Sequence, residues 1–183
     1  MRLLSFSRPL LALTLVIGLC AASGCGPSDP PLPPEPEYCT APTTRDLDAG
    51  TFDGTPPRTI TVGGGDGASF VAWSDGAVAM VIMGFQGGAM ITPTIRVTAR
   101  PADGATMCLH VALHNTLSDA SEVFPGAEAD LTFVRVGDVF EAANFYDQLG
   151  YDAALFRGKT LMLVVDVTGT TFTATSTTSL QLN

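Results

Sequence analysis

From about residue 59 onward, the sequence consists of short runs rich in valine, isoleucine and threonine, separated by turn signals that contain glycine or aspartate. Short runs with alternating apolar and polar residues are typical of β-strands, whereas a surface helix needs a period of 3.6 residues over a longer stretch. The sequence contains no internal repeat. Residues 40–183 therefore predict one all-β domain, which is long enough to bury a hydrophobic core.

The clearest predicted strand covers residues 107–115, where Leu109, Val111 and Leu113 share one face. Residues 91–99 place Ile91, Ile95 and Val97 on one face, and Pro93 marks a bulge or an edge. The other predicted strands cover residues 59–62, 69–73, 77–85, 131–136, 161–167 and 171–182.

Two of the remaining segments need an interpretation. Residues 77–85 are apolar throughout, which predicts a central strand covered on both faces, and the preceding Asp75-Gly76 pair predicts a hairpin turn. Residues 140–149 are ambiguous, because their apolar residues also fit one face of a helix.

Seven or eight strands joined by tight turns predict a single antiparallel β-sandwich. The last segment, LMLVVDVTGTTFTATSTTSLQL, resembles the closing hairpin of bacterial immunoglobulin-like domains. It has an apolar face and a face of threonines that we expect to be solvated. The apolar face holds Phe172, Ala174, Leu180 and Leu182, and the threonine face holds Thr171, Thr173, Thr175 and Thr177.

The N-terminus has the pattern of an export signal, with Arg2 and Arg8, an apolar run over residues 10–19, and small residues up to Cys25. The order Ala-Ser-Gly-Cys resembles the bacterial lipobox, which implies a lipoprotein signal peptide over residues 1–24 and a lipidated Cys25. Cys20 fits this pattern less well, because the bulky Leu19 precedes it. The alternatives are an ordinary signal peptide or an uncleaved anchor, although the apolar run is short for the ~20 residues that span a bilayer.

Two or three acyl chains on Cys25 would hold the chain at a membrane, because each buried methylene contributes about 0.8 kcal/mol. Resemblance to enterobacterial sorting implies the outer membrane, since residue 26 is glycine and not aspartate. We therefore expect a cell-envelope location, with the membrane as a partner through the lipid anchor.

Residues 26–38 contain six prolines among thirteen residues. Proline fixes φ and removes a hydrogen-bond donor, which favours an extended polyproline II chain. We therefore interpret residues 25–39 as the lipidated cysteine and a tether, which would span about 40 Å at ~3.1 Å per residue. The alternative is a proline-rich ligand for a partner domain.

Removal of residues 1–24 would leave seven basic and eighteen acidic side chains, including a single lysine, Lys159. Nucleic-acid binding depends on clustered basic side chains that release phosphate counterions. This charge balance therefore argues against a nucleic-acid partner.

Cys39 and Cys108 would be the only cysteines left once Cys20 is removed and Cys25 is acylated. In an oxidising compartment the two would form one disulfide that closes a loop of about 70 residues, worth roughly 4 kcal/mol in the chain-entropy model. The alternatives are two free thiols or a pair of metal ligands.

Several residues suggest ligand sites without completing one. His110 and His114 share a strand face but would lie about 13 Å apart, and Cys108, His110, Met80, Met83 and Met90 only partly match a copper site. Asp46, Asp48 and Asp53 lack the later oxygen ligands of a calcium loop. Trp73 fits either a ligand-stacking residue or a core residue beneath a turn. We predict no metal site, no cofactor and no catalytic residues.

The stretch WSDGAVAMVIMGFQGGAMITPTIRV resembles uncharacterised lipoproteins of myxobacteria, a group that implies no activity. We therefore expect a lipid-anchored envelope protein that is not an enzyme and that has a structural role or binds another envelope protein. The alternatives are a glycan- or metal-binding β-sandwich and, third, a hydrolase that would use His110 or His114.

Overall fold

The computed structural model describes residues 33–40, 57–64, 69–84 and 87–183. Cys25, the export signal and the aspartates of residues 46–53 lie outside these residues. The described chain is almost entirely β, as predicted, and residues from Leu32 to Asn183 form one compact unit. The one helix within the described ranges is a short 3-10 turn, η1 (Ala153–Leu155). No helix among the described residues has the length and apolar character needed to cross a membrane.

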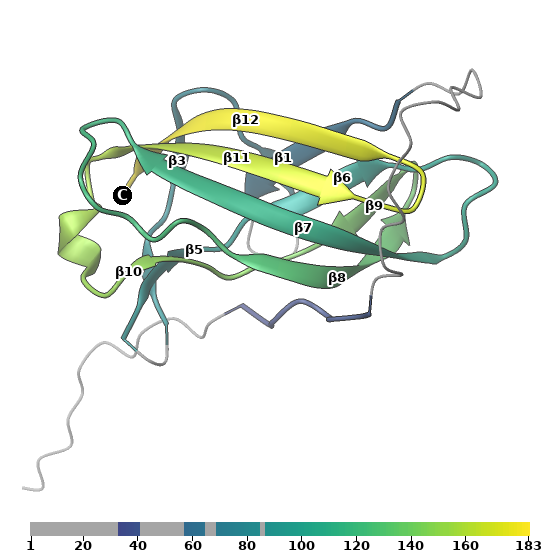
Figure 1. Ribbon diagram of the computed structural model, residues 1–183, viewed down its shortest axis with the longest axis horizontal. Helices are drawn as coiled ribbons and strands as arrows, with labels where there is room; N and C mark the ends of the chain where they lie inside the picture. The colour runs from purple at the N-terminus through teal and green to yellow at the C-terminus, as the bar shows by residue number, and fades with distance from the viewer. Residues whose placement is uncertain (1–32, 41–56, 65–68, 85–86) are drawn as a thin grey trace, which may run out of the picture. The chain divides into compact units, whose positions relative to one another are not determined.

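Most strands belong to one large sheet, which is antiparallel except for one pair of strands (Figure 1). Its order is β2-β1-β6-β9-β8-β7-β11-β12-β3. The bounds are β1 (Ile60–Gly64), β2 (Val71–Ala72), β3 (Ala77–Ala79), β6 (Thr94–Thr98), β7 (Thr106–Leu117), β8 (Glu128–Val136), β9 (Val139–Ala142), β11 (Thr160–Thr168) and β12 (Thr173–Leu182).

The two ends of this strand order are neighbours in the chain, because only residues 73–76 separate β2 from β3. The Trp73 amide donates to Val62 in β1, at 2.9 Å, and the Gly76 amide donates to Ser179 in β12, at 2.7 Å. This segment therefore connects β1 to β12 and rolls the sheet up. Asp75 and Gly76 form a turn, but the predicted hairpin is wrong, since β2 and β3 do not pair and β3 runs parallel to β12.

A second sheet has the order β10-β5-β4, with β4 (Ile82–Met83), β5 (Ala89–Ile91) and β10 (Asp147–Gly150). The pairs β5–β10 and β6–β9 continue one another and cross from one sheet to the other. At the crossing, the Phe145 amide donates to the Pro93 carbonyl at 2.9 Å. Pro93 thus marks the break predicted for residues 91–99, and the ambiguous segment 140–149 forms strands and not a helix. Such corners are where strands of a sandwich switch sheets.

The prediction of a central strand over residues 77–85 is wrong. The described part of this segment divides into β3 and β4, and Val78 and Met80 are 59% and 61% exposed. The apolar character of the run reflects strands near sheet edges and not burial on both faces. Together with the break at Pro93, this division gives more strands than the seven or eight predicted.

The hydrophobic core follows the alternation read from the sequence. Ile91, Ile95 and Val97 are completely buried, and the inward-facing residues of β7 are buried as well. In the β11–β12 hairpin, Leu180 and Leu182 are buried while Thr173, Thr175 and Thr177 are exposed, as predicted. The immunoglobulin-like topology stays a prediction from sequence.

At Gly126 the backbone passes so close to the Leu113 carbonyl that only glycine, which has no Cβ atom, fits. Its φ is +118°, and a Cβ atom there would lie 1.9 Å from the Leu113 carbonyl oxygen. We expect Gly126→Ala to lower the free energy of unfolding by more than about 3 kcal/mol, because left-handed strain and a backbone clash add. Gly137→Ala is the control, since φ is +64° but no atom lies within 4 Å. Urea denaturation should separate the two variants, and equal losses would contradict this reading.

Candidate functional site

The segment 33–40, at the end of the predicted tether, lies against the domain. Cys39 is bonded to Cys108 of β7, as the cysteine count predicts, with Cα atoms 6.0 Å apart. Tyr38 pairs with Leu131, the Thr132 amide donates to the Glu37 carbonyl at 2.8 Å, and the Cys39 amide donates to Asp130 at 3.1 Å. Figure 1 shows the segment running beside β8. The segment therefore covers an open edge of β8, which would otherwise offer unpaired backbone groups.

A groove of about 220 Å³ lies between this segment and strands β8 and β9. It begins where the segment no longer pairs with β8 and β9 pairs with β8 instead. At the far end, the Tyr146 hydroxyl donates to the Pro33 carbonyl. The walls carry prolines, exposed valines and glutamates. They are Pro34, Glu35, Pro36 and Glu37 from the segment, Thr132, Val134 and Val136 from β8, and Glu141, Ala142, Ala143 and Asn144 from β9 and the following loop.

The two histidines lie on the outer face of β7, as predicted, and each meets carboxylates. His110 has Nδ1 2.9 Å from Asp130 and Nε2 3.0 Å from Glu128. His114 lies 3.4 Å from Asp166. Both ring nitrogens of His110 thus face carboxylates and not a hydroxyl, an arrangement that does not provide a general base for a nucleophile.

The other candidate ligands are not brought together. Cys108 is in the disulfide, so its sulfur is not available to copper, and Met90 lies on the smaller sheet, away from the sheet that carries His110. Trp73 packs against the core, in agreement with the structural alternative. Across the described ranges, no group of three His, Cys, Asp or Glu side chains could hold a metal ion.

A buried carboxyl connects the two sheets. Asp147 of β10 is completely buried, and both of its oxygens lie 3.0 Å from Nδ2 of Asn115 in β7. Burial raises the pKa of Asp147 from 3.8 to about 7, although the hydrogen bond from Asn115 opposes this shift. Among the described residues, Oδ1 of Asn115 has no hydrogen-bond partner.

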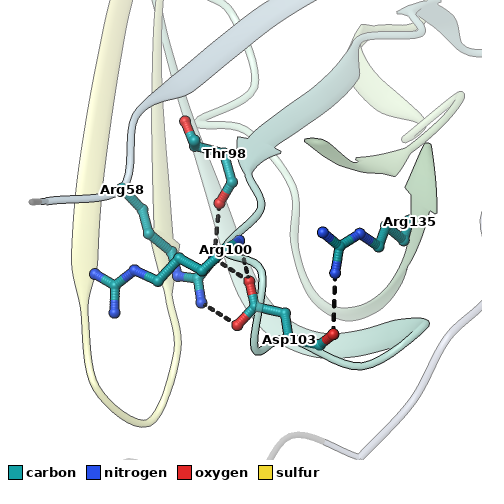
Figure 2. A network of polar contacts seen from close by, with 5 residues as sticks. All are labelled: Arg58, Thr98, Arg100, Asp103 and Arg135. Atoms are coloured by element: carbon teal, nitrogen blue, oxygen red, sulfur yellow. Dashed lines mark hydrogen bonds and ion pairs between the residues drawn. The ribbon is translucent and has the colours of Figure 1, made fainter. Parts of the chain in front are cut away.

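A second polar network joins the segment before β1 to the turn after β6 (Figure 2). Arg58 is 8% exposed and binds both oxygens of Asp103, at 2.7 and 2.9 Å, and the Thr98 carbonyl at 2.7 Å. Arg135 donates to the Asp103 carbonyl at 3.0 Å. The hydrogen bond from Arg58 lowers the pKa of Asp103 to about 2. This network ties the segment before β1 to strand β6, its following turn and β8.

Comparison with protein-family models, with curated proteins and with solved structures gives no match. Function is therefore inferred from the groove and from the disulfide-bonded segment beside it.

Sequence reasoning did not identify the groove glutamates, the Asp147–Asn115 pair or the Arg58–Asp103 pair. Asp147 left no local signal, because Glu141, Asn144 and Gln148 are also polar residues of the same segment. Arg58 and Asp103 are 45 residues apart, and no local pattern connects them.

Asp147 predicts an unusual dependence of stability on pH. Because the pKa of Asp147 is raised in the folded state, its neutral carboxyl contributes at most about 4 kcal/mol to the free energy of unfolding. This contribution is complete below pH 3.8 and is lost as the pH rises through about 7. Asp147→Asn should remove this loss and be more stable at pH 8, since the new amide can also donate to Asn115. Urea denaturation from pH 5 to 8 measures the slope, with the exposed Glu122→Gln as control. An unchanged slope in Asp147→Asn would count against the assignment.

Asp103→Asn should lower the free energy of unfolding at pH 7 by about 3–5 kcal/mol, because it leaves the buried Arg58 charge unpaired. In the native chain this contribution is present above pH 3.8 and is lost as pH falls through about 2. Asp119→Asn is the matched control, because its ion pair with Lys159 is exposed and should matter far less. Equal effects of the two variants in calorimetry would refute the structural role of Asp103.

Proposed function

We propose that this chain is a lipid-anchored protein of the bacterial cell envelope that is not an enzyme and binds another envelope protein. Because residue 26 is Gly26 and not an aspartate, we assign the chain to the outer membrane. The observation that carries this proposal is the disulfide between Cys39 and Cys108. Stable disulfides belong to oxidising compartments outside the cytoplasm, which agrees with an exported chain. The resemblance to uncharacterised myxobacterial lipoproteins agrees with the lipid anchor and implies no activity.

The disulfide also suits a tethered protein. Between a lipidated Cys25 and the docked segment 33–40 there would remain residues 26–32, which span about 22 Å at ~3.1 Å per residue. The domain would then be held close to the bilayer, at roughly half the distance that the full proline-rich stretch would allow.

A role in binding and not in catalysis is supported by how the reactive side chains are used. Both ring nitrogens of His110 are paired with carboxylates, those of Asp130 and Glu128, and Asp147 lies inside the domain against Asn115. The groove, in contrast, presents side chains suited to contact with another chain.

The lipid anchor predicts that Cys25→Ser will move the protein from the detergent-rich to the aqueous phase in detergent phase partitioning. The N-terminal peptide of the native protein should carry the mass of the acyl chains, because the anchor depends on the Cys25 thiol. Cys20→Ser is the control and should stay in the detergent phase. A native protein that is aqueous, with an unmodified N-terminal mass, would sink the proposal.

A further inference from the structure

We propose that the groove between residues 34–37 and strands β8 and β9 binds an extended peptide segment that carries lysine or arginine side chains. This inference rests on the proposed interaction role and names the chemistry of its partner. Three features carry it: the charge of the groove, its apolar surface and its size.

The charge of the groove is negative and mostly uncompensated. Of its three carboxylates, Glu141 is neutralised by Arg96 at 2.6 Å, and Arg96 is itself held over the ring of Phe70. Glu35 and Glu37 form no ion pair with any described residue. The groove therefore retains two carboxylates, which attract a cationic side chain and repel anionic lipid or nucleic acid.

The apolar surface lies beside these carboxylates. Val134 and Val136 project from the outer face of β8 and are 47% and 48% exposed. Lysine and arginine combine an aliphatic stem with a charged end, so the stem can pack on the valines while the charge meets a glutamate. A simple cation would use the carboxylates but leave the valines exposed to water.

The size of the groove favours a peptide over a whole small molecule. Its volume of about 220 Å³ is below the roughly 300–1,000 Å³ of typical small-molecule sites, but it suits one or two side chains of a longer chain. The proline wall is stiff, and the disulfide holds it in place beside β8, so little ordering is needed on binding.

The test is fluorescence anisotropy of a labelled octapeptide of alternating lysine and valine, added to the full chain purified in mild detergent. We expect saturable binding that weakens with salt, and no binding of the matching glutamate–valine peptide.

Glu35→Gln/Glu37→Gln should weaken binding about tenfold, because it removes two exposed charge pairs with the peptide. Val136→Thr, which keeps strand propensity, should also weaken it. Melting temperatures of the variants show whether each remains folded.

The control is Glu122→Gln/Glu128→Gln, which removes the same charge outside the groove and should bind like the native chain. Equal weakening in this control would mean attraction by overall charge alone and would overturn the proposal, as would unchanged binding by Glu35→Gln/Glu37→Gln. Cys39→Ser/Cys108→Ser should also lose binding, because the wall is released. The envelope role is tested separately, by the partitioning experiment with Cys25→Ser. If the native protein proves to be unacylated but still binds the peptide, the groove proposal stands and only the lipid anchor is refuted.

Discussion

The fold depends on the short connection between Val62 of β1 and Ser179 of β12 through residues 73–76. Its two amide hydrogen bonds join the β1 end of the large sheet to the β12 end, next to the short edge strands β2 and β3. With them, the sheet rolls up and only short strands remain at its ends, an arrangement that limits edge-to-edge aggregation. The docked segment lies along the open edge of β8, and the groove lies beside it.

Two carboxyls, Asp103 half-buried in a turn and Asp147 completely buried, show how the same side chain serves opposite electrostatic roles in this fold. Asp103 faces Arg58 and stays ionised, whereas Asp147 faces only the amide of Asn115 and favours its neutral form. The first ties together the turns at one end of the large sheet. The second connects the two sheets through the Asn115 amide, which donates to a carboxyl whose ionised form is disfavoured by burial.

The alternating strands could be predicted from sequence because burial on one face of a sheet leaves a period of two, as around Leu109 and Leu131. The position of a strand within a sheet leaves no such period, so the run at residues 77–85 was misread as central and Asp75-Gly76 as a hairpin. Counting cysteines identified the Cys39–Cys108 pair. The groove could not be predicted, since its walls are about 100 residues apart in sequence and meet only through the sheet order.

The bond between Cys39 and Cys108 also determines how the domain would respond to mechanical force. Without the disulfide, the backbone hydrogen bonds from Thr132 to Glu37 and from Cys39 to Asp130 would open one after another under a pull from the N-terminal side. The covalent bond instead passes the load to β7, which is held on both sides by β8 and β11. Strands held in this way resist by shear, with many hydrogen bonds loaded together, so drag on the domain would stretch the tether before it unravelled the sheet.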